Sequence, residues 1–251
     1  MKAVILCAGK GERLRPLTEN IPKPMILING RPVLEYLIQL CKNNDIKEIA
    51  INTSYLPEKI KEYFGDGSKF GVKINYSFES ELLGTSGALN NFRDFLDEPF
   101  FVIYGDNVTD LNLKKMLKEH QKNKAFATLY LYKEKMANEK TTPGRVIINE
   151  SGEIKEIIEN PNEEQKVKIN SITENLKYSN SGIYILDNKI LKFIPTGYSD
   201  FPKQIFQAIL KADLKIYGYR EDCYIREVGQ MHRYLKAKEE IESNEFLKDF
   251  F

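Results

Sequence analysis

The chain has 251 residues, 42% of them hydrophobic and 29% charged, which is typical of one globular domain or of a domain with a small extension. Its 37 Lys and Arg residues nearly balance 36 Asp and Glu residues, so the net charge is +1. No overall basic field favours nucleic acid, and any site for an anion must be built locally. We therefore expect small-molecule partners and no nucleic acid.

The cysteines and the apolar segments of the sequence indicate in which cellular compartment the protein is expected. The three cysteines, Cys7, Cys41 and Cys223, lie far apart, and the chain has two histidines, so neither a disulfide framework nor a zinc site is indicated. The first apolar run is too short for a signal peptide, and no run has the length of a membrane span. We expect a cytoplasmic protein without membrane contact.

The first half of the chain alternates between strand-like and helix-like patterns. Val4, Ile5 and Leu6 form an apolar run typical of a strand that is buried on both faces of a parallel sheet. Further strands are expected at residues 25–28, 46–52, 72–78 and 100–104, and helices at about residues 32–41, 57–64, 84–95 and 111–120. This alternation predicts an α/β fold with right-handed crossovers, in which helices cover both faces of a mostly parallel sheet.

The pattern changes near residue 124 and becomes richer in strands. Strands are expected at residues 125–133, 178–186, 214–219 and 223–228, a hairpin at 146–158 and a helix at 202–212. The polar stretch 161–175 is expected to be an insertion or a mobile loop. The Lys- and Glu-rich end of the chain predicts a solvated amphipathic helix.

The turn after the first strand carries the first sign of chemistry. Gly9 and Gly11 allow backbone N–H groups to approach a phosphate, although the spacing matches neither the P-loop nor the GxGxxG fingerprint. Arg13 follows, and Lys23 stands between two prolines that are expected to hold an extended backbone and to aim its ammonium group. Ligands of such sheets bind beyond the carboxyl ends of the strands, so we expect a polyphosphate at this turn.

Two acidic residues also end predicted strands. Asp106 follows four apolar residues, and a buried carboxylate there needs a cation, a metal or backbone donors; Asp110 is better placed to cap the next helix. Glu227 closes a later strand, where a salt bridge with Arg226 or Arg220 is as plausible as metal binding. Together Asp106 and Glu227 could hold Mg²⁺, with water and phosphate oxygens completing its shell.

Seven segments resemble motifs of the sugar-1-phosphate nucleotidylyltransferases, and they occur in that family's order over nearly the whole chain. They are LCAGKGERL at residues 6–14, PKP at 22–24, LGTSGAL at 83–89, GDN at 105–107, ENP at 159–161, NSGIY at 180–184 and EVG at 227–229. The resemblance implies a Rossmann-like, doubly wound sheet of GT-A type with a small β-rich sugar-binding extension. It divides the chain into a nucleotide-binding part (1–123), a sugar-phosphate-binding part (124–229) and a C-terminal helix (230–251).

The resemblance also implies roles for individual residues. Arg13, Lys23 and Asp106 would be catalytic, and Mg²⁺ would bind Asp106 and Glu227. The triphosphate nucleotide would contact Leu6, Ala8, Gly9, Gly11, Glu12, Arg13, Lys23, Gly84, Thr85, Ser86 and Gly87. The sugar phosphate would contact Asn107, Gly144, Arg145, Glu159, Asn160 and Asn180.

The acceptor half departs from the family pattern. Asn160 stands where the family has a lysine that holds the sugar phosphate, so that charge is absent or comes from Arg145 or Lys203. LGTSGAL favours GTP with a mannose-like or heptose 1-phosphate. The alternatives are the same chemistry with dTTP, UTP, CTP or a non-sugar phosphate, and a regulatory subunit that binds nucleotide without turnover. No appended left-handed β-helix domain is expected, and a homo-oligomer would have to form through this domain.

Overall fold

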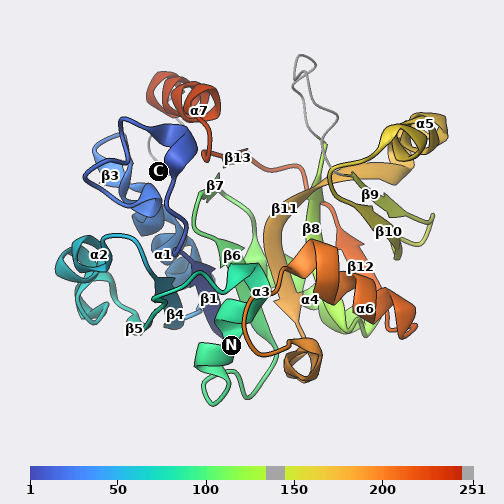
Figure 1. The fold of residues 1–251 in the computed structure, drawn as a ribbon, viewed down its shortest axis with the longest axis horizontal. Helices are drawn as coiled ribbons and strands as arrows, with labels where there is room; N and C mark the ends of the chain where they lie inside the picture. The colour runs from blue at the N-terminus through green and yellow to red at the C-terminus, as the bar shows by residue number, and fades with distance from the viewer. Residues whose placement is uncertain (134–144, 245–251) are drawn as a thin grey trace.

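A nine-stranded sheet crosses the computed structural model, which describes residues 1–133 and 145–244 (Figure 1). In its first half β1 (Lys2–Leu6) lies between β4 (Glu48–Thr53) and β6 (Phe100–Tyr104) and is parallel to both. β5 (Lys73–Phe78) adds in parallel to β4 at the edge. All four strands therefore end on the same side of the molecule, as the alternating pattern predicts.

The second half of the sheet is mixed. β11 (Lys177–Leu186) runs antiparallel to β6 on one side and to β8 (Ala127–Tyr132) on the other, and β12 (Ile216–Tyr219) is parallel to β8. The hairpin of β9 (Arg145–Ile148) and β10 (Ile154–Ile158) joins the start of β11. The predicted α/β fold with a β-rich second part is confirmed, and its division at residue 124 stays a prediction.

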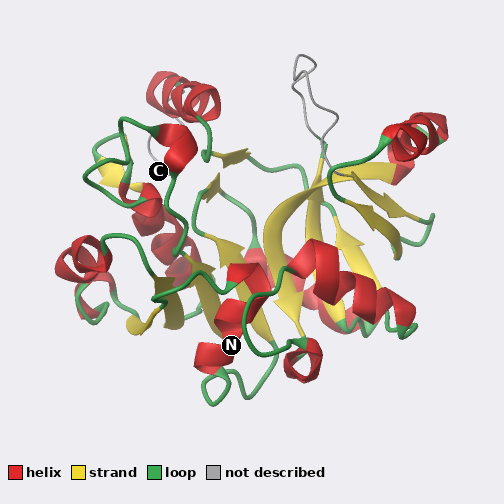
Figure 2. Cartoon of the chain, viewed as in Figure 1, coloured by secondary structure: helices red, strands yellow, loops and turns green. Residues whose placement is uncertain are grey.

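Helices cover both faces of the sheet (Figure 2). α1 (Val33–Asn43), α2 (Pro57–Phe64) and α4 (Leu113–Asn123) share one core with the sheet. On the other face, a core forms with the 3-10 helix Ala88–Phe92, which follows the short α3 (Gly84–Gly87), and with α6 (Phe206–Lys211). Because both faces are buried, the central strands β1 and β6 are apolar runs, whereas the edge strand β5 alternates polar and apolar residues.

The polar stretch at residues 161–175 is mostly helical, so the expectation of a mobile loop is wrong. α5 (Glu163–Ser171) occupies most of it. The Asn162 side chain accepts from the Gln165 amide N–H at 2.8 Å, and the Gln165 side chain accepts from the Asn162 amide N–H at 3.0 Å. This reciprocal cap stabilises a helix whose polarity had pointed to a loop.

The C-terminal helix α7 (Met231–Ser243) is more than a solvated element. Its Tyr234, Ala237 and Ile241 are buried in a third core that Leu14 and Val108 also enter. The Tyr234 hydroxyl donates to the Leu27 carbonyl at 2.8 Å, in the small ladder of β2 (Leu27–Ile28) and β3 (Arg31–Pro32). α7 is therefore fixed beside the loop that follows β1.

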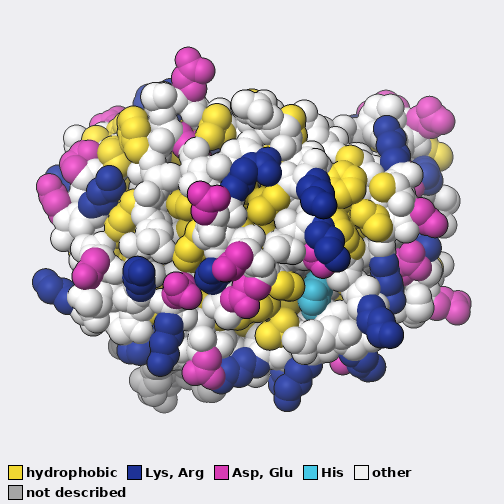
Figure 3. Space-filling model, turned by 90° about the horizontal axis from the view of Figure 1, so that it is seen from below, with side chains coloured by type: hydrophobic (Ala, Val, Ile, Leu, Met, Phe, Trp, Pro, Cys, Tyr) yellow, Lys and Arg dark blue, Asp and Glu magenta, His cyan; other side chains and the backbone are white. Residues whose placement is uncertain are grey.

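The described part of the chain contains no helix that is both long enough and apolar enough to cross a membrane. On the face drawn in Figure 3, Lys and Arg side chains are intermixed with Asp and Glu side chains. Charge on that face is mixed, in keeping with the balanced composition.

Candidate active site

A cavity of about 630 Å³ opens beyond the carboxyl ends of the parallel strands. Leu6 and Tyr104 end β1 and β6 at its floor, and Asn52 and Glu79 reach it from the ends of β4 and β5. Its other wall comes from β11 and the segment around Asp200. A cavity of this size at this edge suits a nucleotide with a second small ligand.

The loop after β1 sets the position of Lys23. Gly11 has φ +68°, and a Cβ there would lie 2.9 Å from the Lys23 Cβ, so glycine is required both for the turn and for the close approach. Pro22 is extended, but Lys23 begins a 3-10 turn (Lys23–Met25), since the Met25 amide donates to the Pro22 carbonyl at 2.8 Å. The expected extended backbone at Lys23 is therefore a tight turn that directs its side chain into the cavity.

Lys23 and Asp106 form an ion pair in the cavity, with 2.6 Å between Nζ and Oδ2. Burial alone would raise the pKa of Asp106, but the Lys23 ammonium outweighs it and holds this pKa below its usual value. The buried carboxylate therefore has a cation, which is one of the partners that the sequence requires for it.

A two-stranded ladder brings Glu227 to the same place. β7 (Asn107–Thr109) pairs with β13 (Ile225–Glu227), with Asn107 opposite Glu227, and the Val228 amide donates to the Asp106 carbonyl at 2.8 Å. A Cβ on Gly229 would lie 2.2 Å from Glu227 Oε1, 2.9 Å from Asp106 Oδ2 and 3.4 Å from Arg13 Nη2. Two carboxylates and one guanidinium, from distant parts of the sequence, thus converge around Gly229.

The salt bridge of Glu227 is made neither with Arg226 nor with Arg220, the two partners expected from the sequence. The Arg233 guanidinium on α7 donates to Glu227 Oε2 at 2.8 Å, whereas Arg226 pairs with Glu240. Burial raises the pKa of Glu227, and the nearby Asp106 raises it further against the effect of Arg233. The proximity of two carboxylates is thus costly without added positive charge.

The donor set fits a hard divalent cation. Asp106 and Glu227 present carboxylate oxygens on the same side of Gly229, and the described residues supply no third His, Cys, Asp or Glu to such a cluster. Mg²⁺ is commonly held by one or two carboxylates, with water and substrate phosphates as its other ligands. Asp106 and Glu227 are therefore the residues that would hold it.

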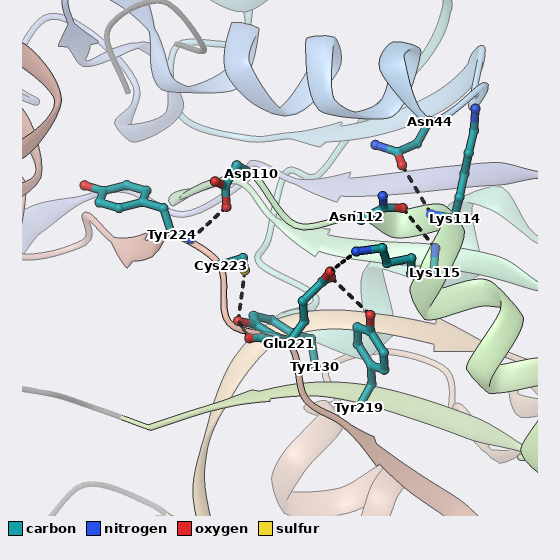
Figure 4. A network of polar contacts seen from close by, with 10 residues as sticks. All are labelled: Asn44, Asp110, Asn112, Lys114, Lys115, Tyr130, Tyr219, Glu221, Cys223 and Tyr224. Carbon is teal, nitrogen blue, oxygen red and sulfur yellow. Dashed lines mark hydrogen bonds and ion pairs between the residues drawn. The ribbon is translucent and has the colours of Figure 1, made fainter. Parts of the chain in front are cut away.

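A polar network fixes the connection that carries β13 (Figure 4). The Glu221 carboxylate accepts from Lys115 at 2.8 Å and from the Tyr219 hydroxyl at 3.1 Å, and the Tyr130 hydroxyl lies 3.0 Å from Cys223 Sγ. Asp110 accepts from the Tyr224 amide at 2.7 Å. The sequence predicted Asp110 as the cap of α4, and this prediction is wrong. The side chain of Asn112 caps the helix instead.

The LGTSG segment is held against residues 197–200. A Cβ on Gly84 would lie 2.3 Å from the Ser199 carbonyl oxygen, and one on Gly87 would lie 2.4 Å from the Gly197 carbonyl oxygen. The Ser86 hydroxyl donates to the Ser199 hydroxyl at 2.8 Å and is fully buried. These small residues therefore permit close packing, and within the segment Gly84 and Thr85 face the cavity.

A bulge in β11 builds the wall opposite the glycine loop. The register with β8 shifts between Asn180 and Tyr184, where Gly182 has φ +75° and lies against the Tyr104 ring. The Asn180 side chain donates to the Tyr184 hydroxyl at 2.9 Å and accepts from the Gly182 amide at 3.2 Å. The bulge holds Asn180 rigidly at the cavity.

The structure brings most of the predicted site residues together. Those that line the cavity are Leu6, Ala8, Gly9, Arg13, Lys23, Gly84, Thr85, Asp106, Asn107, Glu159, Asn160, Asn180 and Glu227. Gly11, Glu12, Ser86, Gly87 and Arg145 are outside its lining, and the Arg145 guanidinium donates to the Ser179 hydroxyl at 3.0 Å. Gly144 lies outside the described residues.

Sequence reasoning missed several lining residues. Asn52, Glu79, Tyr132, Tyr198, Asp200 and Arg233 belong to this group. Asn52 and Glu79 stand at the ends of predicted strands, so the rule that located Asp106 could also have found them. Arg233 gave no such signal, because its role depends on where α7 docks.

The sequence matches the family described as Nucleotidyl transferase over residues 2–244. The chain belongs to the nucleotidyl transferase family. The chain is 35% identical to the UTP–glucose-1-phosphate uridylyltransferase of Synechocystis sp. over 98% of its own length and 64% of that protein. It is 32% identical to the D-glycero-alpha-D-manno-heptose 1-phosphate guanylyltransferase of Aneurinibacillus thermoaerophilus, over 96% of its own length and 99% of that protein.

The fold is also that of solved relatives. The chain superposes on HddC from Yersinia pseudotuberculosis, which was solved in complex with GMP-PN, with a TM-score of 0.75. The superposition covers 95% of this chain and 98% of that one at 24% identity, so it shows the fold alone. The chain spans 64% of the length of the Synechocystis relative.

Proposed function

We propose that this chain transfers a nucleoside monophosphate from a nucleoside triphosphate to a sugar 1-phosphate, releasing pyrophosphate. The observation that carries the proposal is the convergence of Arg13, Lys23, Asp106 and Glu227 in one cavity. Two cations and a carboxylate pair suit a polyphosphate with Mg²⁺. The family match and the names of the relatives support the same reaction class.

The chain's own residues would act mainly through position and charge. The glycine loop and Arg13 hold the β and γ phosphates, and Lys23 lies between the α phosphate and the incoming phosphate. An oxygen of the acceptor phosphate attacks the α phosphorus, and the bond from the α phosphorus to the bridging oxygen of pyrophosphate breaks. The acceptor oxygen is already anionic, so no strong base is required. Mg²⁺ on Asp106 and Glu227 would supply neutralisation of phosphate charge.

GTP with a mannose-like or heptose 1-phosphate is the substrate pair that we favour. The LGTSGAL segment supports it, as do relatives named as heptose and mannose 1-phosphate guanylyltransferases. The Synechocystis relative is named for UTP and glucose 1-phosphate and supports the alternative, which is the same chemistry with another base. A purely regulatory nucleotide-binding role fits less well, because binding alone does not require Arg13, Lys23 and Asp106 to meet.

Lys203 is the best candidate to hold the acceptor phosphate in place of a lysine at position 160. Lys203 belongs to the π-helical turn Phe201–Ile205. It lines the cavity, whereas Arg145 lies outside the cavity lining. No ion pair with a described residue occupies its ammonium group, and it opposes the rise in the pKa of Glu159 that burial and Asp200 cause. Its charge is therefore available to a ligand.

Replacement of Lys203 by Met should raise KM for the acceptor phosphate by about tenfold, the effect of losing one charge-assisted contact. KM for the triphosphate should change little, because its phosphates are assigned to the glycine loop, Arg13 and Lys23. Steady-state kinetics with each substrate varied in turn measure both values. Lys211→Met on α6, an exposed position, is the matched control. Equal acceptor KM values in Lys203→Met and in the unmodified enzyme would contradict this role.

A pyrophosphate-release screen tests the proposed reaction. GTP, UTP, dTTP, CTP and ATP are combined with mannose, glucose and heptose 1-phosphates and with non-sugar phosphates, with Mg²⁺ or with EDTA. We expect Mg²⁺-dependent release with GTP and a mannose-like or heptose 1-phosphate. No release in any combination, with nucleotide binding intact by calorimetry, would instead favour a regulatory role.

A further inference from the structure

Arg233 lines the cavity but has no part in the proposed transfer. It lies in the first turn of α7, and 15% of its side chain is exposed. A guanidinium group placed so deeply needs an anionic partner, and Arg233 Nη1 donates to Glu227 Oε2 at 2.8 Å. Since Glu227 is one of the two carboxylates that would hold Mg²⁺, this ion pair borders the candidate metal site.

Other contacts already dock α7 against β13. Arg226 donates through Nε and Nη2 to the two carboxylate oxygens of Glu240 on α7, each at 2.8 Å. The Tyr224 hydroxyl also donates to Glu240, at 3.1 Å, and the apolar side of the helix is buried in the third core. These contacts lie outside the cavity lining. The distinct contribution of Arg233 is therefore the contact with Glu227 inside the cavity.

The two oxygens of Glu227 have different surroundings. Oε2 accepts from Arg233, whereas Oε1 accepts from the Gly229 amide at 3.1 Å. A Cβ on Gly229 would lie 2.2 Å from Oε1 and 2.9 Å from Asp106 Oδ2, so these two oxygens border the same space. Oε2 is not among the three atoms nearest to that point. Arg233 thus binds the oxygen that is farther from this space and leaves Oε1 beside Asp106.

The two donors together fix the direction of the Glu227 carboxylate. A glutamate side chain has three rotatable bonds, one more than that of Asp106, and repulsion between the two carboxylates favours rotamers that separate them. The guanidinium group on Oε2 and the N–H group on Oε1 hold both ends of the carboxylate against that repulsion. A carboxylate oxygen has about two acceptor positions, so Oε1 keeps one for a cation.

We infer that Arg233 is a positioning residue that holds Glu227 with Oε1 toward Asp106 at the metal site. The inference rests on the proposed function, because it takes Asp106 and Glu227 to be the carboxylates that hold the cation. Arg233 acts through Glu227 and needs no contact with either substrate.

A purely electrostatic role of Arg233 predicts an effect of the opposite sign. Removal of a positive charge beside two carboxylates would strengthen their binding of a cation. Removal of a hydrogen-bond partner that orients a ligating carboxylate weakens the binding of the metal. The direction in which the affinity for a divalent cation changes therefore separates the two roles.

The variant Arg233→Met tests the positioning role, because methionine replaces the apolar stem of arginine and removes its charge and its donors. Mn²⁺ is the probe, and its binding to the protein without nucleotide or acceptor is followed by the electron paramagnetic resonance of the free ion. We expect Arg233→Met to bind Mn²⁺ about 10- to 100-fold more weakly than the unmodified protein. Arg233→Lys, which keeps a charge and a donor, should bind Mn²⁺ with an affinity between the two.

Arg226→Met is the matched control. It also removes an arginine from a 2.8 Å ion pair between β13 and α7, but at a position outside the cavity lining. Its affinity for Mn²⁺ should equal that of the unmodified protein. Melting temperatures establish which variants are folded, and Arg233→Lys replaces Arg233→Met in the comparison if the latter is unfolded.

Three results would overturn the inference: no saturable binding of Mn²⁺ to the unmodified protein, unchanged or tighter binding in the folded Arg233 variant, and an equal loss in Arg226→Met. Weaker Mn²⁺ binding in Arg233→Met alone, without pyrophosphate release in the screen, would support the positioning role while contradicting the proposed transfer. Mg²⁺-dependent release with unchanged Mn²⁺ binding in Arg233→Met would support the transfer and contradict the positioning role.

Discussion

Replacement of Lys23 by Ala is expected to lower turnover by about 10²- to 10³-fold, the scale of removing one positioned electrostatic contact from an active site. Lys23 has its ammonium group 2.6 Å from Asp106 inside the cavity, at the point where a phosphate would lie between donor and acceptor. Single-turnover pyrophosphate release at saturating substrates measures the effect on the chemical step. Rates within about threefold of the original would contradict the role of Lys23.

Lys2→Ala is a close control for this experiment. Lys2 pairs with Asp97 at the same 2.6 Å but lies at the opposite end of β1, away from the cavity. Each variant removes a lysine from an ion pair of 2.6 Å; Lys2 starts β1, and Lys23 lies in the loop that follows this strand. Turnover should fall in Lys23→Ala alone, whereas a shared fall would point to a general loss of folded protein.

Asp106→Asn should lower turnover by about 10²-fold or more and weaken the dependence on Mg²⁺, because the variant keeps the shape of the side chain and loses its charge. Asp106 and Glu227 meet around Gly229, and Lys23 lowers the pKa of Asp106. Of the two carboxylates, Asp106 is the one whose pKa is lowered, whereas that of Glu227 is raised, so the variant removes the one that is more readily ionised. Turnover is measured over a Mg²⁺ series, and the half-saturating concentration should rise.

Asp97→Asn provides the comparison for Asp106→Asn. It neutralises the partner of Lys2 without touching the cavity lining. We expect an unchanged Mg²⁺ series in that variant. A normal rate and a normal Mg²⁺ series in Asp106→Asn would contradict metal binding at this residue.

Local patterns predicted the parallel half of the fold because each strand there has its own apolar signal. β1, β4, β5 and β6 follow from runs such as Val4, Ile5 and Leu6, and their common edge then placed Asp106 beside the glycine loop. α5 was missed for a physical reason: one residue of it is buried, so its cap rather than its periodicity marks it. Asn162 followed by Gln165 three positions later was the available signal.

Other parts of the site depend on contacts between distant segments, and no local pattern carries them. The Glu227 salt bridge goes to Arg233 rather than to its neighbour Arg226, because β7 pairs with β13 and α7 docks beside them. The Asn52–Glu79 bond joins two strand ends, and hydrogen-bond partners of that kind follow from the register of β4 and β5. Both needed the tertiary structure.

The docking of α7 also fixes when the site can exist during synthesis. Arg13 and Lys23 leave the ribosome early, whereas Glu227 and Arg233 follow about 200 residues later, which at roughly 5–20 residues per second is about 10–40 s. Throughout this interval the nascent chain has these two cations without the Glu227 carboxylate that β13 supplies. Since Arg233 lies on α7, the growing chain cannot assemble this cluster of charges before α7 has been made and has docked.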